Sequence, residues 1–475
     1  QQQRSGAPLS RTTYGWSRHA YGSGYEVRSF GYPSSVTQER FELDGVRVSS
    51  TVTANVFDSY GTLVQRQATT TEHAKGLNPY AQHIETVTLA GVINDASNWC
   101  LGRPTTALTT RQHSLPGGSA VTRTVAHGWD LVRCRPTQQV VEPSSTSLRV
   151  TIDVAYDGYG NASSETVTPV GQVARTTNLE WGENGRFLTA RTNAEAHVER
   201  IAWDSATGLP VTSTDPNGLV TSLQHDGFGR LVRQMQPDGT STVISRASCG
   251  TNCAWPGTAY VVNVMERGVG EVPIVSAETG YDREGREVYR RNELPGGSQN
   301  FQVLRYDTRG RLAQQSVPSS CCGSPSRWIT HSYDILDRRV SLERPSSESV
   351  PTPAVMRWRY DGLSVTETDP LGRSTTRRFD AVGRVVQVID PALVDTDYEY
   401  DAFGNLLKTR DVNGTETVLT YDVRGLRRSI TDPSAGHWTF DYFPSGELKS
   451  QTNARWQVTS FTYDWLSRMS TRLEP

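Results

Sequence analysis

Apolar residues occupy every second position in many short stretches of the chain. Met356, Trp358 and Tyr360 alternate with Arg357 and Arg359. The same alternation recurs at Tyr398 and Tyr400, at Leu419 and Tyr421, at Trp438, Phe440 and Tyr442, and at Phe461 and Tyr463. Successive side chains of a β-strand point to opposite faces, so this period of two predicts strands with one packed face and one wet face.

Several stretches of this kind end at an aromatic residue that is followed by Asp and, three residues after the Asp, by Gly. The full copies begin at Phe57, Tyr156, Tyr281, Tyr306, Phe379, Tyr400 and Tyr421, and at His225, which takes the aromatic position. Degenerate copies begin at Trp181, Trp203, Tyr333, Tyr442 and Tyr463. From Phe379 onward the copies start at 379, 400, 421, 442 and 463, a constant spacing of 21 residues. Such self-similarity indicates a repeat architecture.

A unit of 21 residues has room for two strands of about six residues and two turns of about four. In the first turn, Asp accepts hydrogen bonds from the backbone N–H groups that follow it, and Gly takes a positive φ. These turn residues are Asp226, Gly229, Asp282, Gly285, Asp307, Gly310, Asp380, Gly383, Asp401, Gly404, Asp422 and Gly425. The second turn is written TDPNG, QPDGT, TDPLG or TDPSAG, in which Pro fixes φ and Gly completes the turn.

The repeated Asp residues also suggest paired carboxylates for catalysis. A general acid or base needs one special environment, however, whereas these residues recur at the same phase in every unit. We therefore interpret them as turn residues, and we expect the Arg after Gly to pair with neighbouring carboxylates on the strand surface.

Composition agrees with an all-β protein. The apolar fraction is 35%, and 41 Gly and 24 Pro supply many turns. A net charge of −2 gives no general attraction for nucleic acid or an anionic membrane. No apolar run is long enough to span a bilayer, and the opening QQQRSGAPLS lacks the apolar core of a signal peptide. Because the chain stops a few residues into a repeat unit, we expect it to be a piece of a longer protein.

The predicted fold is all-β: tandem hairpins forming one spiralling antiparallel sheet that curls into a partial or whole hollow shell, since a flat sheet would leave its apolar face exposed. We divide the chain into a β-rich region, 1–145, with weak repeats and a repeat array, 146–475. Two stretches near 241–279 and 313–328 expand the spacing, and we interpret them as loop insertions.

The aromatic-Asp-x-x-Gly-[Arg/Asn]-Leu pattern followed by Thr-Asp-Pro-x-Gly resembles the YD repeats of rearrangement hotspot (Rhs) proteins. Their relatives are the toxin-complex BC shells, wall-associated proteins and teneurins. The resemblance is clear over 152–475 and weak before it, through VFDSYGTLVQRQ. It implies a strip of hairpins that spirals into a hollow shell enclosing a toxic C-terminal segment. In the family a D-P-x-G-L segment marks self-cleavage, but TDPLGRS at 368–374 has Arg in place of Leu and lies within the array, so any such module lies beyond Pro475.

The cysteines are the structural disulfide candidates: Cys100, Cys134, Cys249, Cys253, Cys321 and Cys322. Fifteen pairings are possible, and sequence does not choose among them. Disulfides are the first interpretation, free thiols the second and zinc the third, because the spacing is not that of paired C-x2-C ligands. Cys249 and Cys253 lie in one insertion and Cys321 and Cys322 in the other, so bridges between the two loops are the structural hypothesis. Cys100 with Cys134 is a candidate third bridge.

No other motif argues for a catalytic, cofactor or metal site. The acidic stretch at 395–401, DTDYEYD, lacks the Gly and final Glu of a calcium loop. The nine histidines form no short ligand pair, and no Walker loop, G-x-S-x-G elbow or G-x-G-x-x-G after a strand is present. We predict a protein that is not an enzyme and that needs no cofactor or metal.

Three hypotheses for function remain. The first is a non-enzymatic shell segment of a secreted bacterial polymorphic toxin, whose partners are its own C-terminal effector and other YD-repeat segments. The second is a cell-surface array that binds carbohydrate or another cell through exposed aromatic rows. The third is an enzyme with its active centre before Ile152, although no residue cluster there names a reaction. The first two place the protein outside the cell or on its surface.

Overall fold

A computed structural model describes residues 2–4, 7–21, 28–73, 75–249, 254–293, 297–320, 325–346 and 352–475. Thirty-seven strands of this described part form one sheet, and every strand pair in it is antiparallel. Each strand pairs with the next along the chain, except that β6 pairs with β9 because β7 and β8 form a small separate hairpin between them. The helical element of these ranges is a three-residue 3-10 turn, η2 (Val269–Glu271). In the described ranges no helix has the length and apolar character needed to cross a membrane.

The N-terminal strands are β1 (Gln2–Arg4), β2 (Ala7–Tyr21), β3 (Arg28–Phe41), β4 (Arg47–Phe57), β5 (Leu63–Glu72), β6 (Gln82–Ala90), β7 (Ile93–Asp95), β8 (Cys100–Arg103), β9 (Thr106–His113), β10 (Val121–Asp130) and β11 (Arg135–Val141). The middle strands are β12 (Val150–Tyr156), β13 (Ala162–Pro169), β14 (Arg175–Gly182), β15 (Phe187–Thr192), β16 (Val198–Asp204), β17 (Leu209–Thr214), β18 (Val220–His225), β19 (Leu231–Met235), β20 (Ser241–Ser248), β21 (Tyr260–Arg267), β22 (Pro273–Tyr281), β23 (Glu287–Glu293) and β24 (Gln299–Tyr306).

The C-terminal strands are β25 (Leu312–Ser316), β26 (Trp328–Tyr333), β27 (Arg339–Arg344), β28 (Ala354–Asp361), β29 (Ser364–Thr368), β30 (Ser374–Phe379), β31 (Val385–Ile389), β32 (Asp395–Tyr400), β33 (Leu406–Asp411), β34 (Glu416–Tyr421), β35 (Arg427–Asp432), β36 (Gly436–Tyr442), β37 (Leu448–Thr452), β38 (Val458–Tyr463) and β39 (Met469–Leu473).

The alternation of residue types matches the burial of the strands. In β28, Met356, Trp358 and Tyr360 are half-buried, whereas Arg357 and Arg359 are exposed. Register changes just before each repeat aromatic: Thr420 opposes Ser429, but Tyr421 opposes Arg427. The same shift occurs before Phe379, Tyr400, Tyr442 and Tyr463. Because a bulge increases the local right-handed twist, one bulge per unit supplies the curvature of the sheet.

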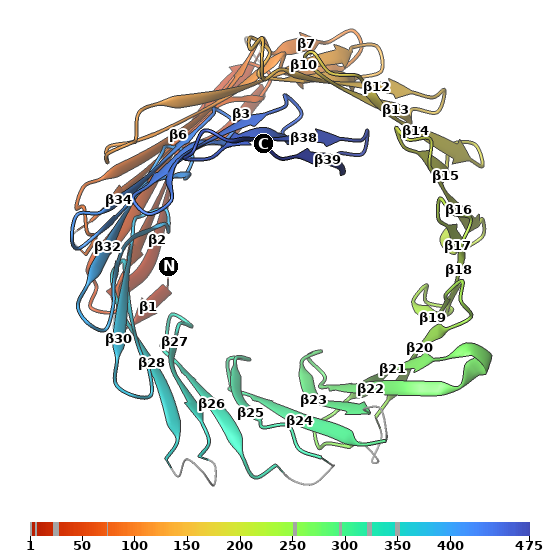
Figure 1. Ribbon diagram of the computed structural model, residues 1–475, viewed down its shortest axis with the longest axis vertical. Helices are drawn as coiled ribbons and strands as arrows, with labels where there is room; N and C mark the ends of the chain where they lie inside the picture. Colours follow the sequence, from red (N-terminus) through yellow and green to blue (C-terminus); the bar gives the residue numbers. More distant parts are fainter. Residues whose placement is uncertain are drawn as a thin grey trace.

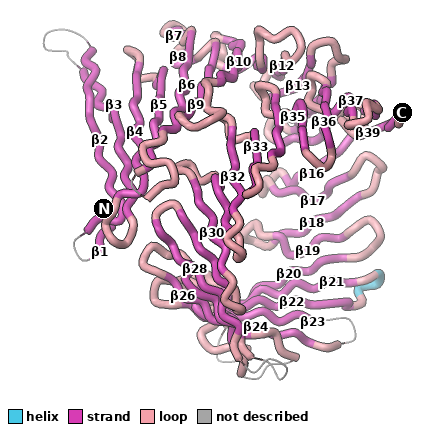
Figure 2. Tube along the Cα trace, turned by 60° about the vertical axis from the view of Figure 1, so that its left-hand side comes forward, coloured by secondary structure: helices cyan, strands magenta, loops and turns pink. Residues whose placement is uncertain are grey.

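The sheet bends round into a ring and continues past its own start, so that β30 to β34 lie beside the N-terminal strands (Figure 1). The ribbon is widest at its beginning, where β2 has 15 residues, and narrows to strands such as β33 with 6 residues. At about 3.3 Å per residue, these strands are about 50 Å and 20 Å long. Figure 2 shows the long β2 to β5 standing side by side at the N-terminal end of the coil.

The protein has little hydrophobic core, because most of it is a single layer of sheet. The buried cluster consists of Val288, Tyr289, Phe301 and Val303 from β23 and β24. Trp255 and Trp328, one from each predicted insertion, pack against it. The insertions therefore thicken the wall at one place.

The extent of the predicted insertions needs correction. Most of 241–279 is regular sheet, because it contains β20, β21 and the start of β22, which pair in sequence order. Residues 254–259 precede β21 and lie outside the strands, and residues 268–272, which include η2, connect β21 to β22. Residues 313–316 belong to β25. β-Branched residues such as Val243, Ile244 and Val264 make these strands without the aromatic-Asp anchor by which the repeats were aligned. The division at residue 145 stays a prediction; β11 and β12 pair across it.

Candidate functional site: the seam between successive turns of the coil

Each repeat turn is held by one aspartate. Asp226 Oδ1 accepts hydrogen bonds from the backbone N–H of Phe228 (2.9 Å) and of Arg230 (3.0 Å), and Oδ2 accepts from Arg230 Nε (2.8 Å). The hydrogen bonds from Arg230 lower the pKa of Asp226 to about 2. Gly229 closes the turn with a φ of +77°.

The other copies have the same geometry. Asp282, Asp307, Asp380, Asp401 and Asp422 accept from the backbone two and four residues on. Gly285, Gly310, Gly383, Gly404 and Gly425 all have positive φ. These residues lie in separate turns along one edge of the ribbon, so the structure gives them a common conformation and does not gather them into one site.

The arginine of one repeat reaches the tyrosine of the next. The Arg311 guanidinium lies 4.8 Å from the centre of the Tyr333 ring, and the Tyr333 hydroxyl donates to the carbonyl oxygen of Leu312 at 2.9 Å. Equivalent stacking joins Arg286 to Tyr306, Arg338 to Tyr360 and Arg384 to Tyr400. Stacking of a cation on an aromatic face is favourable, so each unit is fastened to its neighbour.

The turns of the second pass of the coil also contact the opposite edge of the first pass. These contacts form a seam between residues 42–195 and residues 334–467. The seam joins residues that are 270 apart at Glu195 and Trp465 and 320 apart at Glu42 and Gly362. One turn of the coil therefore takes about 300 residues of chain.

Ion pairs mark one end of the seam. Glu42, a buried carboxylate, accepts from both terminal nitrogens of Arg338 at 2.8 and 3.0 Å and from the backbone N–H of Gly362 at 3.2 Å. Burial opposes ionisation of Glu42, but the hydrogen bonds and charge of Arg338, together with the backbone N–H groups of Leu43 and Gly362, outweigh it and lower the pKa of this carboxyl. Nearby, Lys75 Nζ lies 2.7 Å from Asp361 Oδ1.

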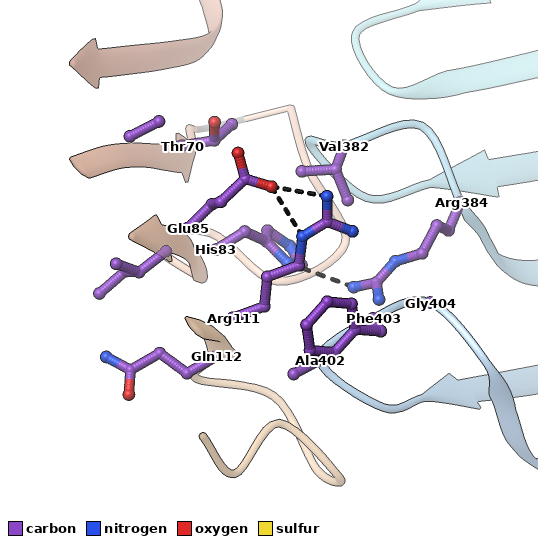
Figure 3. Close-up of a pocket in the computed structure, with 12 residues that line it drawn as sticks. Thr70, His83, Glu85, Arg111, Gln112, Val382, Arg384, Ala402, Phe403 and Gly404 are labelled. Carbon is purple, nitrogen blue, oxygen red and sulfur yellow. Dashed lines mark hydrogen bonds and ion pairs between the residues drawn. The ribbon is translucent and has the colours of Figure 1, made fainter. Parts of the chain in front are cut away.

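A cluster of buried charged residues lies at the middle of the seam. Glu72 and Asp380 are 0% and 1% exposed. Glu72 Oε1 accepts from the backbone N–H of Ala381 at 3.2 Å. Arg384 donates to Asp380 Oδ2 at 2.6 Å, and its Nη2 lies 3.2 Å from Nδ1 of His83 (Figure 3). Two carboxylates and one guanidinium thus face each other across the two passes.

Beside this cluster is a cavity of about 440 Å³. Phe403 lines the cavity and lies between two arginines of the first pass. The centre of its ring is 5.0 Å from the guanidinium carbon of Arg111 and 3.8 Å from that of Arg123. Arg111 is paired with Glu85, as the dashed lines of Figure 3 show. Arg123 Nε donates to the carbonyl oxygen of Val423 at 2.7 Å. The charged groups around the cavity are committed to one another, an arrangement that clamps two edges together.

A third group of contacts fastens the far end. Arg175 Nη1 donates to Glu447 Oε1 at 2.7 Å and to the Ser467 hydroxyl at 2.6 Å. Gln172 accepts from the backbone N–H of Ser445 at 3.1 Å, and Glu447 also accepts from the Ser445 hydroxyl. Burial raises the pKa of Glu447, but these hydrogen bonds outweigh it and lower the pKa to about 2.

The structure joins Cys100 and Cys134 in a disulfide. Cys249 is also disulfide-bonded, while Cys253, Cys321 and Cys322 lie outside the described residues. The bridge between the two insertions stays a prediction. Among the residues with described positions, no group of three His, Cys, Asp or Glu side chains is placed to hold a metal ion. In the acidic stretch at 395–401, the side chains of Asp395 and Asp397 both accept hydrogen bonds from the side-chain amide of Gln387.

Reasoning from the sequence missed the seam. Glu42, Glu72, His83, His113 and Arg175 belong to turns and strand ends that follow no repeat pattern. A usable signal existed: the second turns of the first pass, such as HAKGLNPYAQ at 73–82 and SLPGGSAV at 114–121, depart from the D-P-x-G form. Turns that dock against another edge lose that form, and the free turns TDPNG and TDPLG keep it.

Comparison with known families identifies the repeats. The model of the RHS repeat family matches residues 203–241, 360–392 and 396–437. These segments contain the Asp and Gly turns at 226–229, 380–383, 401–404 and 422–425. The matched segments lie in both passes of the coil.

Solved structures show the same fold. The TcdB2-TccC3 crystal structure superposes with a TM-score of 0.77 over 99% of this chain at 12% identity. A TcdB2-TccC3-Cdc42 structure superposes with a TM-score of 0.74 over 99% of this chain, at 12% sequence identity. A TccC3 mutant of the Photorhabdus luminescens Tc holotoxin pore superposes with a TM-score of 0.76 over 99% of this chain, at 10% sequence identity. This chain spans about a third of the length of those chains, 32%, 34% and 33% respectively.

A second similarity is to an enzyme. Over 248 residues, 47% of this chain and 70% of the relative, the sequence is 25% identical to glyceraldehyde-3-phosphate dehydrogenase of Clostridium acetobutylicum. The Clostridium pasteurianum enzyme gives 24% over the same length. Dinucleotide-binding folds are built from parallel βαβ units. The described pairs here are antiparallel, so this similarity does not extend to the fold.

Proposed function

Because this chain is an Rhs-repeat protein whose sheet winds past one full turn, we propose that it is a wall segment of a hollow toxin shell. In this role the protein is a container and has no catalytic activity of its own. The observation that carries the proposal is the seam, because contacts between residues 270 to 320 positions apart turn an open ribbon into a continuous wall.

The wall would act by geometry. Each hairpin contributes one narrow strip of surface, and many weak contacts with a cargo chain sequester it without recognising one sequence. A wall with gaps between successive turns would let proteases and solvent reach that cargo. The buried ion pairs and stacked arginines of the seam are suited to keeping the turns together.

The proposed cargo is a C-terminal effector polypeptide that follows this segment, and the proposed location is outside a bacterial cell or on its surface. The Cys100–Cys134 disulfide fits an oxidising compartment. Likeness of fold to TcdB2-TccC3 supports other YD-repeat segments as partners that extend the wall.

The alternative, an adhesion array, has less support. It needs rows of exposed aromatic side chains across neighbouring strands. Tyr14 and Trp16 on β2 are exposed, with their ring centres 6.3 Å apart, and Tyr260 is exposed on β21. The other exposed aromatic residues among those described lie in turns: Tyr60, Tyr80, Trp99, Tyr159, Phe228, Trp456 and Trp465.

Protease protection tests the container function. The chain would be expressed together with the polypeptide that follows Pro475 in its gene and digested with proteinase K. We expect the following segment to survive digestion while attached to the folded shell and to be cleaved rapidly when expressed by itself. Equal cleavage in both contexts would rule out the container. Binding of the isolated chain to a glycan array, with no protection, would favour adhesion.

A further inference from the structure

Two buried histidines sit side by side on the first pass of the coil, where it meets the second. His83 on β6 and His113 on β9 are directly opposite in the sheet register, their rings lie 5.3 Å apart, and each is only 8% exposed. Both contact turns of the second pass. A histidine titrates near pH 6.5 when unperturbed, so histidine is the side-chain type that gains a charge in mildly acidic solution.

The contacts of His83 show which ring nitrogen carries the proton when the ring is neutral. Its Nδ1 lies 3.2 Å from Nη2 of Arg384, and a guanidinium can only donate, so Nδ1 must accept and the ring proton is on Nε2. That Nε2 lies 3.9 Å from Glu72 Oε1 and 3.8 Å from Asp380 Oδ2 and makes no hydrogen bond. A second proton on His83 would have to occupy Nδ1, where it would face the guanidinium.

His113 is held in the same way. Its Nε2 lies 3.1 Å from the carbonyl oxygen of Tyr400, which can only accept, so Nε2 carries the proton. Its Nδ1 is buried without a hydrogen-bond partner. It faces Gly118, where a Cβ atom would lie 2.2 Å from Nδ1. A second proton on this ring would have no acceptor.

The charges around the two rings determine whether protonation of the rings is favoured or opposed. Glu72 and Asp380 favour a positive ring, whereas Arg384 and the other histidine oppose it; Glu85 and Arg111, farther along the same strands, neutralise each other. With both rings protonated, three positive charges would face two negative ones in a buried place. Burial, Arg384 and His83 together lower the pKa of His113.

We propose that His83 and His113 form an acid-sensitive latch, whose protonation releases the turns at 380–384 and 400–404 from the first pass of the coil. The latch does not depend on what the coil encloses. Since the docked state holds His113 with a lowered pKa, its stabilising contribution is complete above about pH 6.5 and is lost as the pH falls through the docked value. The wall would be sealed at neutral pH and loosened in acid.

Hydrogen exchange measured by mass spectrometry tests the latch. The reporter is the backbone N–H of Ala381, which donates to Glu72 across the seam. After correction for the intrinsic rate, we expect its protection to fall at least tenfold between pH 7.5 and pH 5. In a His83→Gln, His113→Gln variant the fall should be less than twofold, because the glutamine amides keep neutral donor and acceptor groups.

His331→Gln is the matched control. His331 is half-buried, and burial and Arg339 lower its pKa, but it lies on β26, outside the residues that form the seam. The latch predicts that this variant responds to pH like the wild type. A pH response that survives in the double variant, or no response in the wild type, would overturn it.

A measurement on the wild type covers the case in which the double variant does not fold. Hydrogen–deuterium exchange at the histidine C2 position reports the pKa of each ring. We expect His113 to titrate at a lower pH in the folded protein than in urea. Titration at the same pH in both states would overturn the latch.

Discussion

Arg338 and Glu42, which are 296 residues apart, form a two-pronged ion pair that joins successive turns of the coil. The same guanidinium bonds Asp334 in its own turn through Nε and stacks on Tyr360 of the next repeat. One side chain therefore links a turn, a neighbouring repeat and a distant edge. Repeat proteins usually make contacts only between adjacent units, and the seam adds long-range contacts to this chain.

Arg338→Gln is expected to open the seam locally. Removing one partner of a buried ion pair leaves an uncompensated charge and costs about 3 kcal/mol. We expect the opening free energy of the Gly362 amide, measured by hydrogen exchange, to fall by about this amount, because that N–H donates to Glu42. Local exchange is the appropriate measurement, since a long repeat array does not unfold in two states.

Arg373→Gln is the matched control. Arg373 bonds Asp369 in its own turn at the same 2.7 Å as Arg338 bonds Asp334, but it lies on a free edge and its side chain is 64% exposed, against 22% for Arg338. Exposed ion pairs contribute less than about 1 kcal/mol. A comparable loss of Gly362 protection in this variant would show that the seam pair has no special role.

Gly117→Ala is expected to separate the two passes next to His113. Gly117 has a φ of +79°, and a Cβ atom there would lie 2.4 Å from Leu407 Cδ1 and 2.9 Å from the Tyr400 carbonyl oxygen. Gly171→Ala provides the comparison, since its φ is +70° but nothing lies within 4 Å. In both variants the left-handed conformation of the new alanine costs about 1–2 kcal/mol. Only Gly117→Ala should increase exchange at 400–404; equal effects at that segment would exclude close docking.

Phe403→Leu tests the stacking at the cavity. Leucine keeps an apolar side chain but has no ring face for Arg111 and Arg123, and desolvated cation–π contacts are worth up to about 2 kcal/mol. Phe228 has the same position in its own turn, is 85% exposed and stacks only on Arg230 among the described arginines. We therefore expect Phe403→Leu to raise exchange in 400–425 and Phe228→Leu to leave it unchanged. No difference between them would argue against the clamp.

Glu447 gives the seam a second dependence on pH, well separated from that of the histidines. Because the folded pKa of Glu447 is about 2, below its ordinary value of 4.5, its contribution is complete above pH 4.5 and is lost as the pH falls toward 2. Protection of the Ser445 amide, which donates to Gln172, should decline over that range. Glu447→Gln should be less protected at neutral pH and respond less to acid.

Glu416→Gln controls for acid effects within one pass. Glu416 also has a lowered pKa, but its partners Arg410 and Lys408 belong to the adjacent strand. Its replacement should leave Ser445 protected as in the wild type. If both glutamate variants change the Ser445 amide equally, the acid response belongs to the sheet in general and not to the seam.

The all-β fold and the antiparallel coil follow from local features of the sequence. The alternation before Tyr421 specifies strands, and the turn chemistry of Asp422 and Gly425 fixes where the chain reverses. The hairpins at 241–279 were missed because Val243 and Ile244 form a strand without the aromatic-Asp anchor. Local patterns sufficed wherever neighbouring units determine one another.

The seam could not be predicted in the same way. Arg311 and Arg338 occupy the same position of the repeat, but Arg311 bonds the nearby Asp307 and Asp337, whereas Arg338 also meets a partner 296 residues away. Which turn reaches which edge depends on the twist accumulated over a whole circuit of strands. Individual strand twists vary by about ten degrees or more, and small differences summed over many strands shift the meeting point by several hairpins.

Zero-length cross-linking tests the coil most directly. Carbodiimide joins an amine to a carboxylate only when the two are in contact, and the chain has only three lysines, Lys75, Lys408 and Lys449. Lys75 Nζ lies 2.7 Å from Asp361 Oδ1, 286 residues along the chain, while Lys408 contacts Glu416 within one pass at 3.5 Å. A Lys75–Asp361 peptide pair in the monomer, recovered alongside the Lys408–Glu416 pair, is the predicted result. Recovery of the Lys408–Glu416 pair with Lys75 linked only to nearby residues such as Asp44 would contradict the coil.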